Sequence, residues 1–262
     1  MIRGATTADY PSFAELFREL GIDDPTPSAE RWSSELAHHT LISERAGDVD
    51  GYVTFIALSE VGHVRNLVVA ARARGTGVGR DLMKAAADRL RARGIGEWHL
   101  NVKVDNTPAI RLYERLGMQV EHRSTVLRVD VARFTELPHA PADALPVSPE
   151  EDDDIERTLD LLGGRIAMMR GKPGHVLVQL RDPSTFAAVG FAAFDPSLPG
   201  AMPFRVARAE LAGTMLAELA KHTTNPRIQL VIEDDRATTD LLLRIGGEVR
   251  LELLHYRGAL PD

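Results

Sequence analysis

The segment that decides the fold, residues 66–80, reads NLVVAARARGTGVGR. Its opening continues an apolar strand pattern that starts at Val64, and its glycine-rich end leads directly into a helix expected from about Arg80. The first N–H groups of a helix have no internal partner, and the helix dipole adds partial positive charge there. Because glycine has no Cβ, an anion can approach such a backbone closely. The segment therefore predicts a phosphate-binding loop.

The glycine spacing of this loop does not match two common nucleotide motifs. A dinucleotide fingerprint needs a glycine three residues after Gly77, where Arg80 stands, and the Gly-Lys-Ser/Thr of a P-loop is absent. The pattern that remains is Arg-x-x-Gly-x-Gly, made by Arg74, Gly77 and Gly79. Arg74 and Arg80 can add charge-assisted hydrogen bonds to a phosphate. By itself the pattern is also compatible with a purely structural turn.

Strand and helix patterns alternate on both sides of the loop. Before it, residues 13–20 carry one apolar helical face, and residues 40–58 read as two strands joined by a turn. After it, residues 98–104 alternate as a strand, and a helix follows between a cap at Asn106 and an end at Gly117. This order predicts an α/β fold with a mixed sheet.

A second copy of this pattern follows the first. Shifting the numbering by 129 superimposes the apolar positions of the two halves without a gap, and it places Gly117 on Gly246. The Pro- and Ala-rich residues 137–146 run into an acidic stretch and interrupt the periodicity. We therefore predict two tandem domains of one α/β type, at 1–135 and 151–262, joined by a linker at 136–150.

The segment after the next strand, residues 106–118, reads NTPAIRLYERLGM. Together with the loop it resembles the GNAT superfamily of N-acetyltransferases over roughly residues 1–135, although Met118 and Ala71 replace the usual aromatic and a frequent proline. The resemblance implies that the strands at 64–69 and 98–104 splay apart and admit the pantetheine arm of acetyl-CoA. It implies coenzyme contacts from strand backbone, loop amides and helix cap, at Leu67, Val68, Val69, Arg74, Gly75, Thr76, Gly77, Val78, Gly79, Arg80 and Asn106.

The implied reaction requires an oxyanion donor and an acid. An amine attacks the thioester carbonyl in a ternary complex, an oxyanion forms, and a thiolate leaves. A backbone N–H exposed by a strand distortion near Val68 or Val69 is expected to stabilise the oxyanion. Tyr113 is expected to protonate the thiolate, because a phenol with a pKa of about 10 is protonated at neutral pH and GNAT enzymes carry such a tyrosine in this motif. Tyr113 also fits the buried face of its helix, which is the structural alternative.

An amine must lose a proton before it attacks, so a base is expected as well. Glu60 is our prediction and His63 an alternative, because both precede the key strand segment and can reach its open end, although a turn glutamate is often only solvated. His99 and Asn101, on the neighbouring strand, either line the substrate channel or pack against a covering layer. No His, Asp or Glu cluster has metal-ligand spacing, so no metal is expected.

The second domain is predicted to be degenerate. The shift places residues 74–79 on 203–208, where all three glycines are replaced, and it places Tyr113 on Leu242, which cannot donate a proton. A Cβ at each replaced glycine would enter the space of a diphosphate. The domain is expected either to wall the acceptor site, where its acidity would favour a cationic amine, or only to support the first domain.

The composition limits the partners of the 262-residue chain. The net charge is −7, and residues 136–262 account for all of it, with 13 Lys and Arg against 20 Asp and Glu. An acidic half argues against nucleic acid as a partner. The sequence has no cysteine, no run near the roughly 20 apolar residues of a membrane span and no secretory h-region, so we expect a cytoplasmic protein without a membrane partner.

These observations favour an N-acetyltransferase that moves an acetyl or short acyl group from coenzyme A to an amine. The sequence leaves open whether the acceptor is a small amine, an amino acid, an aminoglycoside-like antibiotic or a protein amine, and it does not give the oligomeric state. The alternative is a non-catalytic module that binds acyl-CoA and regulates a partner. The presence of Tyr113 favours the enzyme.

Overall fold

The computed structural model describes residues 1–20, 25–58 and 61–261. The chain folds into two compact units. Met1–Glu121 and Leu254–Asp262 form the first unit, and His122–Leu253 form the second. Among the described residues, no helix combines the length and the apolar character needed to cross a membrane.

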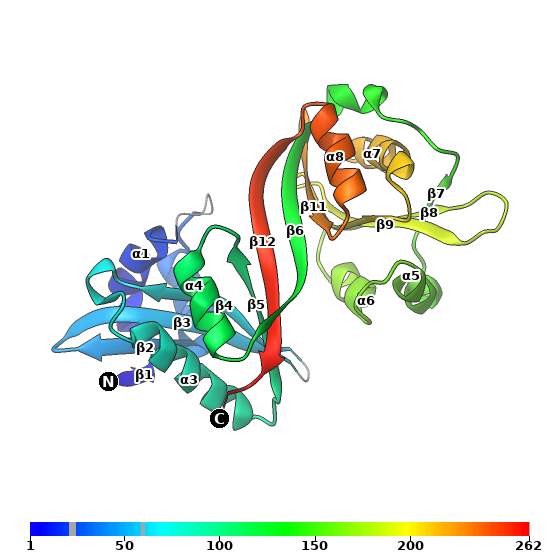
Figure 1. The fold of residues 1–262 in the computed structure, drawn as a ribbon. Helices are drawn as coiled ribbons and strands as arrows, with labels where there is room; N and C mark the ends of the chain where they lie inside the picture. The colour runs from blue at the N-terminus through cyan, green and yellow to red at the C-terminus, as the bar shows by residue number, and fades with distance from the viewer. Residues whose placement is uncertain (21–24, 59–60, 262) are drawn as a thin grey trace. The chain divides into compact units, whose positions relative to one another are not determined.

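The first unit is built on a mixed sheet (Figure 1). Its strands are, in spatial order, β1 (Ile2–Gly4), β2 (Thr40–Arg45), β3 (Asp48–Leu58), β4 (Val61–Val69) and β5 (Glu97–Lys103), followed by the end of β12 (Glu248–Ala259). Strands β1 to β4 pair antiparallel, whereas β4 and β5 pair in parallel. The β2–β3 pairing confirms the predicted hairpin, and Gly47 at its turn has a φ of 88°, which glycine adopts readily.

Helices cover both faces of this sheet. They are α1 (Tyr10–Arg18), α2 (Ala29–Arg31) with the helical stretch after it, α3 (Val78–Arg91) and α4 (Thr107–Arg115). One core joins Phe13 of α1 to Tyr52 of β3, and a second joins Leu82 of α3 to Val53 and Trp98. Because neighbouring residues of a strand point to opposite faces, Tyr52 and Val53 place these two cores on opposite sides of the sheet.

The second unit repeats this architecture. Its strands are, in spatial order, β6 (Gln119–Asp130), β11 (Arg227–Glu233), β10 (Gly200–Val206), β9 (Ala188–Asp195), β8 (Val176–Arg181) and β7 (Asp143–Pro146). Its helices are α5 (Asp152–Thr158), α6 (Arg165–Arg170), α7 (Ala212–Ala220) and α8 (Arg236–Arg244). Shifted by 129, the bounds of α4 and β6 coincide with those of α8 and β12, so the predicted repeat holds in this part of the chain.

The two compact units are not the two halves of the sequence. Strand β6 starts in the first half, yet its residues 124–130 pair with all seven residues of β11 in the second unit. Conversely, residues 254–262 follow the second half and belong to the first unit. The segment 136–150, predicted as a linker, contains β7, which pairs with β8 at four positions. Each unit is therefore completed by a strand from the other half of the sequence.

The ungapped shift of 129 is wrong around the glycine loop. Counting 129 residues from the loop gives residues 203–208, but Pro203–Val206 lie in strand β10. The first residues of β10 pair in parallel with β11, just as β4 pairs with β5. The connection from β10 to α7 is therefore residues 207–211, which contain no glycine and are fewer than the residues between β4 and α3. The second unit has lost the loop by shortening as well as by substitution.

Candidate active site

Strands β4 and β5 separate part of the way along their length. They pair from Val61 and Glu97 to Val64 and Leu100, and the register ends there although β4 continues to Val69 and β5 to Lys103. The predicted splay of the two strands is therefore confirmed. Its position leaves one edge of β4 open between residues 65 and 69.

The register of β4 with β3 decides which amides face this opening. The N–H of Ala70 donates to the Asp50 carbonyl at 2.9 Å, and Val68 lies opposite Tyr52 in the same ladder. Because hydrogen-bonded positions alternate along an antiparallel pair, the backbone groups of Leu67 and Val69 face the opening, whereas those of Val68 face β3. Of the three predicted backbone ligands, two are thus turned toward the space between the strands.

The strand distortion lies earlier in β4 than expected. The β3–β4 register shifts between Thr54, opposite Asn66, and Phe55, opposite Val64, so Arg65 is the extra residue of a β-bulge. We expected the distortion near Val68 or Val69, where the register is regular. A bulge bends and twists its strand. The bend at Arg65 follows the last β4–β5 pair and accounts for the separation of the strands.

The glycine loop ends as an open helix N-terminus. Gly75 and Gly77 have φ values of 76° and 96°, in the left-handed region that favours glycine, and Gly77 is the residue before α3. The hydroxyl of Thr76 donates to the Ala73 carbonyl at 2.7 Å and closes the turn. The ladder of the helix starts with the Asp81 N–H, which donates to the Gly77 carbonyl at 3.0 Å. The amides of residues 78–80 precede it without a partner in the helix ladder, at the place where the anion site is predicted.

Gly79 connects this helix N-terminus to the opening between the strands. A Cβ at Gly79 would lie 3.4 Å from Leu112 Cδ2, 3.5 Å from Val69 Cγ2 and 3.9 Å from Leu67 Cδ2. Leu112 belongs to α4, and the other two side chains belong to the free end of β4. The start of α3, the open edge of β4 and the helix that carries Tyr113 therefore meet at this glycine.

The two predicted phosphate-binding arginines differ in their surroundings. The Arg74 side chain donates to Glu19 Oε2 at 2.6 Å and to the Val69 carbonyl at 3.1 Å, so it ties the loop to α1 and to β4. Arg80 is 63% exposed, and its ion pair among the described residues is a 3.4 Å contact with Asp81. Arg80 is thus the more available of the two cations beside the predicted anion site.

Tyr113 is buried on the inner face of α4. It is 6% exposed and packs in the core shared by α3, α4 and β5. Burial raises the pKa of the Tyr113 phenol above its ordinary value, so the hydroxyl is protonated at neutral pH. Asn106 caps this helix as predicted, because its side chain accepts from the Ala109 N–H at 3.3 Å.

His63 lies where β4 and β5 are about to separate. It is opposite His99 in the register, and the two rings are edge to face with centroids 4.6 Å apart. Burial, followed by the nearby His99 and Arg65, lowers the pKa of His63 to about 4, so the imidazole is neutral at neutral pH. Glu60, the predicted base, lies outside the described residues.

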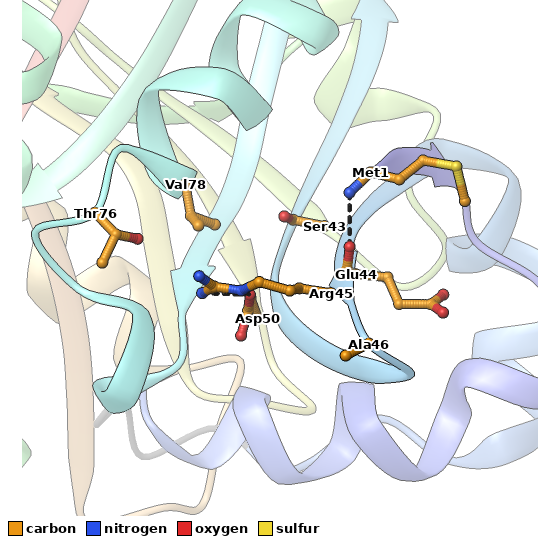
Figure 2. A pocket seen from close by; sticks show the side chains of 8 residues that line it. All are labelled: Met1, Ser43, Glu44, Arg45, Ala46, Asp50, Thr76 and Val78. Carbon is orange, nitrogen blue, oxygen red and sulfur yellow. Dashed lines mark hydrogen bonds and ion pairs between the residues drawn. The ribbon is translucent and has the colours of Figure 1, made fainter.

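A cavity of about 490 Å³ lies on another flank of the loop (Figure 2). It is lined by Met1, Ser43, Glu44, Arg45, Ala46, Asp50, Thr76 and Val78. Arg45 points to the buried Asp50 carboxylate at 2.8 Å, so the main charges of the cavity neutralise each other. The cavity shares Thr76 and Val78 with the loop but includes no residue of the strand opening.

The second unit is closed at the equivalent place. Arg205 of β10 donates to the Glu233 carbonyl of β11 at 2.9 Å and to the Leu159 carbonyl at 3.0 Å, so its guanidinium bridges the two strands. Leu242, the counterpart of Tyr113, is fully buried in the core. The pairing of β10 with β11 also stops early, at Ala201 and Leu230, but the Arg205 guanidinium bridges the strands beyond that point, and Leu242 is no proton donor.

One residue near Tyr113 was not predicted from the sequence. Tyr256, on the part of β12 that belongs to the first unit, has its ring centroid 6.0 Å from that of Tyr113. Its hydroxyl donates to Glu114 Oε1 at 3.4 Å. A comparison of equivalent positions in the two repeats could have indicated it, since its counterpart under the shift of 129 is Leu127.

Sequence comparisons give relatives of one kind. The Acetyltransferase (GNAT) family profile matches residues 8–118. Streptothricin acetyltransferase of Streptomyces lavendulae is 34% identical over 110 residues, which cover 41% of this chain and 57% of that protein. N-alpha-acetyltransferase RimI of Mycobacterium tuberculosis is 34% identical over 128 residues, which cover 45% of this chain and 77% of that protein. The chain thus spans a little over half the length of the first relative and most of the second.

The fold of the whole chain is also found among solved structures. A tandem GNAT protein from the clavulanic acid biosynthesis pathway has a TM-score of 0.58 at 15% identity, and the match covers 97% of this chain and 94% of that one. Two units with one strand topology, one of them without the glycine loop, agree with this likeness. The chain therefore belongs to the GNAT family of acetyltransferases, in a tandem arrangement with a degenerate second unit.

Proposed function

We propose that the chain is an N-acetyltransferase that moves an acetyl group from acetyl-CoA to an amine by direct attack in a ternary complex. The observation that carries the proposal is that three elements meet at Gly79: the N-terminus of α3, the open edge of β4, and α4, which carries the buried Tyr113. A thioester carrier with a diphosphate at one end and a long amide arm fits these three features. The second unit, with Arg205 across its strands, contributes no second coenzyme site.

The residues present suit each part of the coenzyme. The amides of Val78, Gly79 and Arg80 would bind the diphosphate, with the Arg80 guanidinium as an added donor. The backbone groups of Leu67 and the N–H of Val69 would pair with the amides of the pantetheine arm, as a neighbouring strand would. The Val69 carbonyl is used by Arg74, and Val68 faces β3, so neither takes part.

The proposed acetyl transfer takes place at the end of the pantetheine arm, where the thioester would lie. The amine nitrogen bonds to the thioester carbon, the carbon–sulfur bond breaks, and the sulfur takes a proton from the Tyr113 hydroxyl. Its raised pKa keeps Tyr113 protonated until the thiolate forms. The attacking amine must give up its own proton, and Glu60 remains the predicted base. His63 is the alternative, but its lowered pKa makes its neutral imidazole a weak base.

The acceptor class is tested with a panel of amines. The relatives are named for streptothricin and for N-alpha amines, so the panel contains streptothricin, peptides with a free α-amine, peptides with a free lysine and simple diamines. Release of free CoA is measured with the wild-type chain and with Tyr113→Phe. We expect turnover with at least one amine and a fall in kcat of about 10²-fold or more in the variant.

Coenzyme affinity separates the two functional readings. Calorimetry should give Tyr113→Phe the wild-type affinity for acetyl-CoA within threefold, because the substitution removes one hydroxyl. Tight binding without turnover of any amine would favour a regulatory acyl-CoA-binding module. No binding of acetyl-CoA at all would refute both functions.

A further inference from the structure

Tyr256 is built into the core of the first unit although it follows the second half of the sequence. It is 1% exposed and shares a core with Tyr113, Leu116 and Leu254. Its ring lies 6.0 Å from that of Tyr113 at an angle of 55°, and its hydroxyl donates to Glu114, the next residue of α4. The C-terminal strand therefore touches the helix of the proposed acid directly.

The rest of this strand end is attached to the same unit. Arg257 donates to Glu97 Oε2 at 2.6 Å and to Glu121 Oε1 at 3.1 Å. The Leu260 N–H donates to the Gly96 carbonyl at 2.9 Å, just before β5. These contacts hold the residues that follow Tyr256 against the first unit.

A glycine of β12 lies close to Met118 in the first unit, and a glycine just before β12 lies close to α8 and Val129 in the second. A Cβ at Gly258 would lie 3.0 Å from the backbone Cα and 3.4 Å from the side-chain Cγ of Met118, directly after α4. A Cβ at Gly247 would lie 2.8 Å from the Leu242 carbonyl oxygen and 3.5 Å from Val129 Cγ2. Under the shift of 129, Met118 corresponds to Gly247 and Val129 to Gly258. Each unit thus combines one glycine with one larger side chain.

The tyrosines follow the same rule. Tyr113 and Tyr256 lie together in the first unit, and their counterparts Leu242 and Leu127 lie together in the core of the second. In the first unit, β12 therefore places a tyrosine beside the tyrosine of α4. In the second unit, β6 places a leucine in the same core as the leucine of α8. Repeat position alone does not explain this, because the tyrosine of the second half is used by the first unit.

We infer that Tyr256 is a positioning residue for Tyr113, supplied to the catalytic unit by the C-terminal strand of the degenerate half. The inference rests on the proposed function, because it requires Tyr113 to be the acid that protonates the leaving sulfur. The Tyr256 ring supports the ring of Tyr113, its hydroxyl holds Glu114, and Gly258 lets the strand lie against the end of α4. Together they set where the Tyr113 hydroxyl meets the leaving sulfur.

A double-mutant cycle in the full chain tests the inference. Tyr256→Leu, which installs the residue of the second unit, should lower kcat about tenfold while the KM for acetyl-CoA and the calorimetric affinity for CoA change less than twofold. In a Tyr113→Phe background the same substitution should change kcat less than twofold, because a positioning residue acts through its partner. Tyr256→Phe keeps the ring and should recover most of kcat. Leu127→Val, the matched change in the second unit, should leave kcat unchanged.

The outcomes separate this inference from the proposed function. An equal fall in kcat from Tyr256→Leu in both backgrounds, or no fall in either, would overturn the positioning role while Tyr113 remains the acid. Full activity of Tyr113→Phe would remove the acid and the positioning role together. Hydrogen exchange of the unsubstituted chain in guanidinium gives a test that needs no variant. The amides of residues 254–259 should exchange at the same guanidinium concentration as those of α4. Exchange together with the amides of β11 would overturn the inference.

Discussion

Replacing Gly79 by alanine should separate the stability of the fold from its affinity for coenzyme. Gly79 lies in the first turn of α3, outside the left-handed region, and the added methyl would meet its nearest neighbour, Leu112 Cδ2, at 3.4 Å. That distance is an ordinary van der Waals contact, so the free protein should accept alanine. Because alanine loses less chain entropy than glycine in a helix, the free energy of unfolding should rise by up to about 1 kcal/mol.

The same methyl should weaken coenzyme binding. It would point toward Leu112, Val69 and Leu67, where the start of α3 meets the open edge of β4, and would crowd the coenzyme where its diphosphate joins the arm. A hydrogen bond to a charged group contributes about 1.5–3 kcal/mol, and each 1.4 kcal/mol is a factor of ten in affinity. Loss of one such bond therefore predicts a rise of about 10- to 100-fold in the Kd for acetyl-CoA.

Two measurements on one pair of variants decide this prediction. Calorimetry gives the Kd for acetyl-CoA, and thermal unfolding gives the change in stability. Gly96→Ala is the matched control, because a Cβ there has no neighbour within 4 Å and it should leave the Kd unchanged. A folded Gly79→Ala protein that binds acetyl-CoA with wild-type affinity would refute the assignment of the anion site.

Further outcomes follow from the surroundings of individual side chains. Arg80→Ala should raise the Kd for acetyl-CoA, measured by calorimetry at low salt, about five- to tenfold. Arg74→Ala should raise it less than threefold, because Glu19 and Val69 already engage that guanidinium. Equal effects of the two substitutions would contradict the different roles of the two arginines. His63 has a folded pKa of about 4 against an ordinary 6.5, so its contribution to stability is complete above pH 6.5 and is lost as the pH falls toward 4. That loss should be about 2–3 kcal/mol, and guanidinium unfolding of His63→Gln should show a flatter dependence on pH over this range; an unchanged slope would contradict the assignment.

The parts of the site that were predicted from sequence depend on local signals. Gly77 needs a left-handed conformation before α3, and Asn106 caps α4 with its own side chain, so both helix starts are encoded within a few residues. Tyr113 falls on the buried face of α4 because of the helical period. These features do not require knowledge of which strands pair.

The parts that were not predicted depend on pairing between distant residues. The bulge at Arg65 exists only in the register of β4 with β3, and the pattern of apolar residues does not contain it. The shift of 129 aligns the helices, but it cannot show that Pro203–Val206 form a strand beside β11. A repeat read by counting therefore placed a loop where the fold has a strand.

The exchange of strands is the clearest example. Strands β6 and β12 have equivalent positions in the two repeats, so the periodicity of either one is compatible with either unit. The discriminating signal is the grouping of Tyr113 with Tyr256 and of Leu242 with Leu127, which is visible only once the neighbours are known. For this reason, the domain boundaries at 135 and 151 describe the repeats of the sequence, whereas the compact units divide at 121 and 254.

Main-chain amides at the start of α3 are proposed to bind the diphosphate of coenzyme A, and an NMR titration of the full chain with CoA tests this binding at those atoms. The amide resonances of Val78, Gly79 and Arg80 should show the largest shifts and should saturate together with the calorimetric isotherm. Saturable binding that leaves these three resonances unmoved, or no binding at all, would contradict the account.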